Sequence, residues 1–162
     1  NARADYQLAG LNFDEELEVV GRCLSPSDFG LHNAIIGRDG RLAFVDFEYF
    51  GWDSPVKSVS DFVLHPGSAF TDPLLRHSLE IMVPYCMSED QYFLVRLKAL
   101  YPLFALIWCL ILLNEFLPER WTRRVIAGEA RDCEHIQARQ LDRAEKRLES
   151  ISNIYDIAPG LA

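Results

Sequence analysis

Two short apolar runs, residues 33–36 (NAII) and 41–45 (RLAFV), flank the tetrapeptide 37–40 (GRDG) in the first third of the chain. β-Branched and aromatic side chains favour extended backbone, whereas Gly and Asp favour the tight turn that joins antiparallel strands. The pattern therefore predicts a β-hairpin over residues 33–45. This hairpin constrains the fold most, because it places the start of its first strand beside the end of its second.

Most of the remaining chain has the residue spacing of helices. Apolar residues recur at intervals of three to five, and Pro or Ser stands where a helix can begin, as in the pair Asp72-Pro73. The expected helices cover residues 13–20, 72–85, 88–99 and 130–151, and residues 119–124 are expected to form a charged connector. The predicted fold class is mainly α with a small β-hairpin, in a single domain over residues 1–162.

The most apolar segment is Ala99–Leu113, which holds fifteen uncharged residues between Lys98 and Asn114. A membrane-spanning helix needs about 20 such residues, and Pro102 lies inside this segment. The segment therefore predicts a buried helix of a helical subdomain rather than a membrane span.

Composition and charge narrow the class of protein. Apolar residues make up 49 % of the chain and charged residues 25 %, which is typical of a soluble globular domain. The formal net charge of −8 argues against nucleic-acid and membrane-surface partners, and residues 1–66 alone hold eleven acids and five bases. The four cysteines have no zinc-site or disulfide spacing, so we expect a reducing, cytoplasmic location.

Three polar residues flank the open end of the predicted hairpin. Asp28 precedes it, Asn33 begins its first strand, and Asp46 follows its second strand. The strand pairing brings Asn33 close to Asp46, and Asp28 is near enough along the chain to fold over the same place. Carboxylate and carboxamide oxygens suit Mg²⁺, so the three residues predict a magnesium site. The alternative is that Asp28 and Asn33 only cap local backbone.

Four motifs in this part of the chain form a family pattern. They are residues 27–33 (SDFGLHN), 44–48 (FVDFE), 51–55 (GWDSP) and 60–62 (SDF). Together they resemble the Brenner-type catalytic segment of aminoglycoside phosphotransferases and choline kinases, and their spacing is similar to that of protein kinases. The resemblance covers residues 25–62 and implies the C-terminal lobe of a protein-kinase-like fold, with a catalytic segment (22–62) and a helical subdomain (67–162).

The resemblance implies an activity and a set of roles. The activity is ATP-dependent transfer of a phosphoryl group to a hydroxyl of a small molecule, similar to an aminoglycoside or choline. Asp28 corresponds to the catalytic aspartate that orients the attacking hydroxyl, and Asn33 and Asp46 correspond to the Mg²⁺ ligands. The net acidity favours a cationic acceptor, because a negative cleft concentrates cations.

Other polar residues of the segment are weaker candidates. Glu48 and Asp53 are candidates for substrate binding, although Glu48 is equally well an exposed acid and Asp53 a turn residue before Pro55. Asp61 is expected to support the catalytic loop by accepting backbone hydrogen bonds. His32 has no second histidine near it in the sequence and is expected to be structural or solvent-facing.

The chain departs from the family pattern in two ways. Pro26-Ser27 stands where the family has His-Gly, which puts the packing of the catalytic loop in question. Only 27 residues precede Asp28, and no glycine-rich phosphate loop occurs. We therefore expect a fragment without the nucleotide-binding N-terminal lobe, inactive in isolation. The apolar surface that this lobe would cover is then exposed, and the same surface is suited to a homodimer.

Two alternatives remain open at the level of the sequence. The first is a non-catalytic binding or scaffold module that keeps the kinase-like lobe, because the phosphate loop and its lysine are missing. The second is a metal-dependent hydrolase, which usually needs more His or carboxylate ligands than the segment 25–62 offers.

Overall fold

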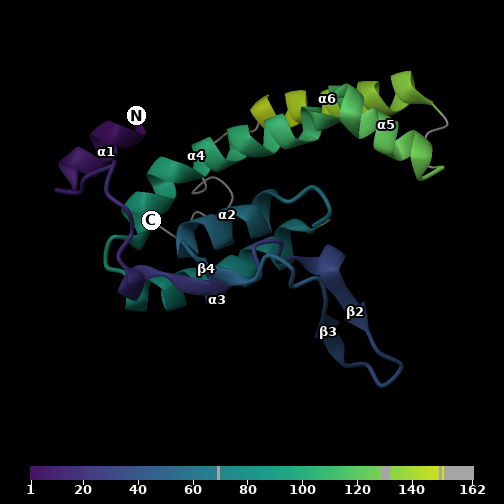
Figure 1. The fold of residues 1–162 in the computed structure, drawn as a ribbon. Coiled ribbons are helices and arrows are strands. Elements are labelled where there is room, and N and C mark those ends of the chain that lie inside the picture. The colour runs from purple at the N-terminus through teal and green to yellow at the C-terminus, as the bar shows by residue number, and fades with distance from the viewer. Residues whose placement is uncertain (69, 129–131, 150, 152–162) are drawn as a thin grey trace. The chain divides into compact units, whose positions relative to one another are not determined.

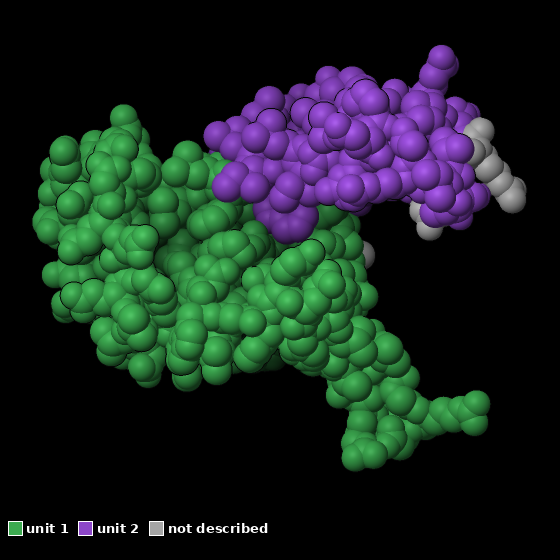
Figure 2. Space-filling view, in the orientation of Figure 1, with its two compact units in different colours: residues 1–104, 153–162 green, residues 105–152 purple. Residues whose placement is uncertain are grey.

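The computed structural model describes residues 1–68, 70–128, 132–149 and 151. These residues are mainly helical, as predicted, and they fall into two compact units, with the boundary along the chain between residues 104 and 105. The first unit includes residues 1–104 and the second residues 105–152 (Figure 2). The finer prediction of a kinase-like lobe with a boundary between residues 62 and 67 stays a prediction.

The strands of the first unit form two short antiparallel pairs. The predicted hairpin is confirmed as β2 (Ala34–Ile36) and β3 (Leu42–Phe44), with Ala34 opposite Phe44. Gly40 in its turn has φ +77°, a conformation that favours glycine. The hairpin extends away from the helices of its unit (Figure 1).

The second pair joins segments on either side of the hairpin. β1 (Cys23–Ser25) pairs with β4 (Gly51–Asp53), and Leu24 lies opposite Trp52. β4 was not expected from the sequence. This pairing closes residues 23–53 into one loop. The chain just before the motif at residues 27–33 therefore lies beside the motif that begins at residue 51.

The helices of the first unit supply its apolar core. They are α1 (Ala2–Leu8), α2 (Pro55–Leu64), α3 (Asp72–Glu89) and the first part of α4 (Phe93–Leu112). Pro55 stands in the first turn of α2, and α2 packs against both α3 and β1. The most buried apolar side chains of this unit are Val56, Val59, Leu64, Leu79, Val83, Phe93, Leu97 and Tyr101.

The second unit contains the end of α4, the 3₁₀ turn η3 (Leu113–Phe116), α5 (Pro118–Ile126) and α6 (Cys133–Glu149). Arg124 of α5 donates two hydrogen bonds to the carboxylate of Glu115, at 2.6 and 2.7 Å. Cys109 of α4 donates to the carbonyl of Ala144 in α6. These contacts hold α5 and α6 to the turn η3 and to the end of α4.

The predicted helix over residues 13–20 is wrong. The N-terminal helix is α1, which ends before Gly10, and only the single 3₁₀ turn η1 (Val19–Gly21) follows. Gly10 has φ +73°, which reverses the chain, and Asp14 then accepts hydrogen bonds from Arg3 in α1, the longer at 2.8 Å. The helix-like spacing of the apolar residues at 13–20 therefore does not correspond to a helix.

The predicted connector at 119–124 is also wrong, because these residues belong to α5. Pro118 occupies the first turn, where its missing N–H costs nothing, and the Thr122 hydroxyl donates to the Pro118 carbonyl at 2.9 Å. The charged residues at 119–124 belong to an amphipathic helix and not to a connector.

The helix expected to start at residue 88 starts later. Residues 88 and 89 end α3, and α4 begins at Phe93. Asp90 lies between the two helices, and its carboxylate accepts the N–H of Tyr92 at 2.9 Å. The helix expected over 130–151 is observed as α6 at 133–149, while residues 130, 131 and 150 lie outside the described residues.

The apolar helix is longer than the run that predicted it. Together with η3 it covers Phe93–Phe116, and an 18-residue window within it has a mean hydropathy of 1.8 and is 33 % buried. Its length and composition alone would allow it to cross a membrane, which is weak evidence because core helices of soluble proteins pass the same test.

Candidate active site

The loop that carries Asp28 is held by its own backbone and by hydroxyl groups. The Ser25 hydroxyl accepts the N–H of Ser27 at 3.0 Å, and the Asp28 N–H donates to the Pro26 carbonyl at 2.7 Å. The Ser27 hydroxyl donates to the carbonyl of Tyr49 at 3.2 Å, across the closed loop. Pro26 and Ser27 therefore support the loop through these contacts.

Asn33 joins this loop to the hairpin. Its Nδ2 donates to the Asp28 carbonyl at 2.9 Å, and its own carbonyl accepts the N–H of Val45 at 2.9 Å. Asp46 follows Val45 and has φ +66°, and Ser27 before Asp28 has φ +62°. Among the described residues other than glycine, only these two have positive φ. Such backbone is unfavourable by about 1–3 kcal/mol and collects at functional sites.

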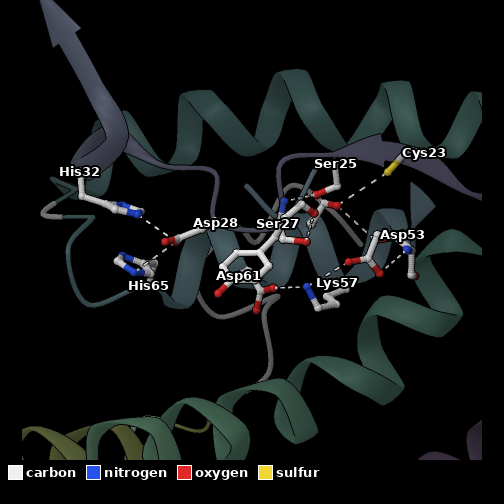
Figure 3. A network of polar contacts seen from close by, with 12 residues as sticks. Cys23, Ser25, Ser27, Asp28, His32, Asp53, Lys57, Asp61 and His65 are labelled. Atoms are coloured by element: carbon white, nitrogen blue, oxygen red, sulfur yellow. Dashed lines mark hydrogen bonds and ion pairs between the residues drawn. The ribbon is translucent and has the colours of Figure 1, made fainter. Parts of the chain in front are cut away.

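Two histidines flank the Asp28 carboxylate. His32, in the 3₁₀ turn η2 (Leu31–Asn33), places Nε2 at 2.9 Å from Asp28 Oδ1, and His65, just after α2, places Nε2 at 3.4 Å from the same oxygen. Figure 3 shows both rings on one side of Asp28. The rings stack with centroids 3.6 Å apart and planes inclined by 14°. His32 therefore stacks on a histidine that lies far from it in the sequence.

Sequence reasoning missed His65 because it lies far along the chain. Only the course of α2, which runs from β4 back past the Asp28 loop, brings it to His32. A usable signal existed for His32, because a residue four positions after Asp28 in a tight turn can reach back to it.

Lys57 forms ion pairs with two acidic residues, Asp53 just before α2 and Asp61 within it. Lys57 Nζ lies 3.0 Å from Asp53 Oδ2 and 2.9 Å from Asp61 Oδ2, all on or next to α2 (Figure 3). Burial lowers the pKa of Lys57, but hydrogen bonds to Asp61 and Asp53 outweigh burial and hold this pKa above its ordinary value. Asp53 also accepts the N–H of Ser54 at 2.8 Å.

These contacts give Asp53 and Asp61 structural partners at the start of α2. Support of the catalytic loop by Asp61 and substrate binding by Asp53 stay predictions. Glu48 is exposed after the hairpin, and its contact with substrate also stays a prediction.

Aromatic rings fix the loop and hairpin to α2. Phe29, next to Asp28, packs against Phe44 of β3 and Phe62 of α2, with ring centroids 4.8 and 5.8 Å apart. Phe62 also contacts Phe70 at 4.7 Å. The position of Asp28 is therefore set by an apolar contact on the adjacent residue.

Much of the remaining apolar surface of this segment is uncovered. The exposed side chains share a location on the strands and the turns that follow them, and they are Leu24, Ile35, Ile36, Leu42, Phe47, Phe50 and Trp52. Such a concentration on a folded domain usually marks a surface that contacts another part of a protein or a ligand.

A separate surface pocket of about 570 Å³ lies in the first unit, and its lining includes Tyr6, Phe13, Glu16 and Glu89. Asp28, Asn33 and Asp46 are not among its lining residues. The pocket therefore does not belong to the site around Asp28.

Comparison of the chain with protein-family models, with curated protein sequences and with solved structures finds no match.

Proposed function

We propose that this chain is the catalytic part of an ATP-dependent phosphotransferase that acts on a hydroxyl of a small molecule. The observation that carries the proposal is the connection of Asp28, Asn33 and Asp46 through one hydrogen-bonded loop and hairpin, with positive φ at Ser27 and Asp46. The four motifs that resemble the phosphotransferase segment include all three residues.

The donor atoms suit Mg²⁺. Asn33 uses Nδ2 on the Asp28 carbonyl, which leaves its Oδ1 as an oxygen ligand. The Asp46 carboxylate is exposed, so it can join the coordination shell of a metal ion. Hard oxygen ligands are what Mg²⁺ prefers, and one or two protein ligands suffice because phosphate and water complete its shell.

In this reaction Asp28 orients the acceptor hydroxyl and takes its proton, for which the carboxylate must come within about 2.6–3.2 Å of the hydroxyl oxygen. The Asp28 side chain is 42 % exposed, so an acceptor can reach it. Asn33 and Asp46 would hold the metal, which would neutralise phosphate charge in the complex with Mg-ATP. Little covalent chemistry is required of the protein, because positioning supplies most of the rate in phosphoryl transfer.

The exposed apolar surface on the strands supports a second part of the proposal. It is suited to contact with a nucleotide-binding lobe, and residues 1–162 contain no glycine-rich loop for the phosphates. We propose that the nucleotide is bound between this surface and protein outside residues 1–162. The surplus of acids in residues 1–66 favours an acceptor that carries amino or quaternary ammonium groups.

The test is ADP release by the full protein that its gene encodes, with Mg-ATP and a panel of aminoglycosides, amino alcohols and neutral sugars. We expect turnover with a cationic acceptor and a fall of about 10²–10⁴-fold for Asp28→Asn, the range for loss of a general base. Asp39→Asn is the matched control, because Asp39 is an exposed carboxylate in the hairpin turn. Binding of Mg-ATP without turnover on any acceptor would favour the scaffold alternative instead.

A further inference from the structure

The contacts of the stacked histidines define where their protons lie. His65 Nδ1 accepts the backbone N–H of Gly67 at 3.0 Å. A nitrogen that accepts a hydrogen bond carries no proton, and a neutral imidazole has one donor and one acceptor. His65 therefore carries its proton on Nε2, the atom that faces Asp28 Oδ1 at 3.4 Å.

The same reasoning applies to His32. Its Nε2 lies 2.9 Å from Asp28 Oδ1, where a proton makes a charge-assisted hydrogen bond and a lone pair would face a carboxylate oxygen. Its Nδ1 is buried and has no hydrogen-bond partner among the described residues. A bare lone pair is the less costly atom to leave there, since an unpaired buried N–H is rarer in folded proteins than an under-satisfied acceptor.

These proton positions argue against a metal ion, although three ligand-type atoms of Asp28, His32 and His65 lie within 4.8 Å of one another. A histidine binds metal through an unprotonated nitrogen, and coordination by His65 Nε2 would cost the hydrogen bond from Gly67.

We propose that His32 and His65 are positioning residues that clamp the catalytic carboxylate, His32 by an Nε2–H hydrogen bond to Asp28 Oδ1 at 2.9 Å and His65 by an Nε2–H group that faces the same oxygen at 3.4 Å. The role assigned to Asp28 rests on the proposed function, whereas the clamp itself is a statement about protons and contacts. Because both Nε2–H groups face Oδ1, Oδ2 is left for the acceptor hydroxyl. One ring belongs to η2 and the other follows the end of α2, so the stacked pair fixes the carboxylate relative to both elements.

The burial of the histidines suits this role. Their side chains are 18 % and 16 % exposed, compared with 42 % for Asp28, so the clamp lies behind the carboxylate and away from the solvent side. The clamp supports Asp28 through residues that follow it in the sequence. The family that residues 25–62 resemble has a histidine just before the catalytic aspartate, and this chain has Pro26 at that position.

The first experiment measures the protons directly. In ¹⁵N-labelled protein, long-range ¹H–¹⁵N spectra distinguish Nδ1–H from Nε2–H histidine, with His32→Gln and His65→Gln used to assign the two signals. We expect both histidines as Nε2–H tautomers, unchanged when one equivalent of Zn²⁺ is added. The exposed residues His77 and His135 serve as references in the same sample. An Nδ1–H tautomer at His65, or coordination shifts at both Nε2 atoms with Zn²⁺, would overturn the clamp.

The second experiment measures positioning in the active full protein. We expect His32→Leu/His65→Leu to lower kcat about 10- to 100-fold, with KM for ATP changed less than about twofold, because the carboxylate is misplaced while nucleotide binding remains. His32→Gln/His65→Gln keeps an N–H at each position and should recover most of kcat. His77→Leu is the control for the loss of a histidine.

The outcomes separate the two proposals. If no acceptor is phosphorylated, the tautomer measurement still decides the clamp. If turnover exists and the leucine double variant, confirmed as folded by its thermal unfolding, keeps the wild-type kcat, the positioning role is wrong. Equal losses in the leucine and glutamine variants would also contradict it, since the donor groups would then be irrelevant.

Discussion

Two parts of the first unit bury their apolar residues very differently. In the helices α2 to α4, Val59 is 1 % exposed and Leu79 is fully buried. In the site segment, which we define as residues 22–53, Ile36 is 73 % and Trp52 62 % exposed. Both parts are rich in apolar residues, so composition does not explain the difference.

The difference indicates which part of the first unit supplies most of its stability. The helices bury the apolar core of the first unit, whereas the site segment is held by the β1–β4 pair, the contacts of Phe29, and hydrogen bonds around Asp28. Its outer surface remains available to another lobe or a ligand. A site built on such a segment can be changed with little loss of global stability.

The largest expected effect is a direct comparison of the two parts. Leu79→Ala should lower the free energy of unfolding by about 2–5 kcal/mol, because it opens a cavity in a filled core. Ile36→Ala on the hairpin should change it by less than about 0.5 kcal/mol. Urea unfolding monitored by circular dichroism measures both. Equal losses would show that the hairpin is covered by something that we have not identified.

A smaller effect is expected where the two parts join, at Gly30. A Cβ at this position would lie 2.7 Å from His32 Nδ1 and 2.8 Å from the Ser68 hydroxyl, so Gly30→Ala must move one of them. Overpacking of this kind costs about 1–3 kcal/mol. We expect the Nε2–H signal of His32 to shift more than that of His65. An unchanged His32 signal would show that the loop absorbs the methyl group.

A third prediction concerns Lys57, which ties β4 to α2 through Asp53 and Asp61. Its pKa is raised in the folded protein above the ordinary 10.5, so its contribution is complete below pH 10.5 and is lost as the pH rises through the folded value. Lys57→Met should cost roughly 0.5–1 kcal/mol at pH 7, because a partly exposed pair is screened by solvent. It should also flatten the alkaline decline in stability. A parallel decline in both proteins would contradict this assignment.

The smallest expected effect concerns the rate at which the Cys86 thiol is alkylated. Burial raises the pKa of Cys86 in α3 to about 11. Because the thiolate is the reactive form, its alkylation rate should still rise about tenfold per pH unit between pH 8 and 10. In the urea-unfolded protein the same rate should level off near pH 9. Mass spectrometry of the modified peptide follows both, and a plateau near pH 9 in the folded protein would show that Cys86 is solvated.

Parts of this architecture were predictable from local chemistry. The turn GRDG and the apolar runs around it specify the hairpin, and Pro73 marks the start of α3. The positions of Asp28 and Asn33 in one loop follow from their separation by four residues. Each of these features depends on residues that are near one another in the sequence.

The features that were missed depend on distant contacts. β4 has only three residues, too few for a pattern, and it exists because β1 lies beside it. His65 reaches Asp28 only because α2 returns the chain to the loop. The false helix at 13–20 had acceptable periodicity, but Gly10 and the Arg3–Asp14 pair turn the chain away from it.

The central claim is that Asp28 is the catalytic carboxylate of a phosphotransferase. Transfer of ³²P from [γ-³²P]ATP to the acceptor found in the panel, followed in a single turnover by the full protein, tests it most directly. We expect Asp28→Asn to slow transfer by at least about 100-fold while Asp39→Asn transfers at the wild-type rate. Transfer by Asp28→Asn at the wild-type rate would show that Asp28 is not the catalytic carboxylate.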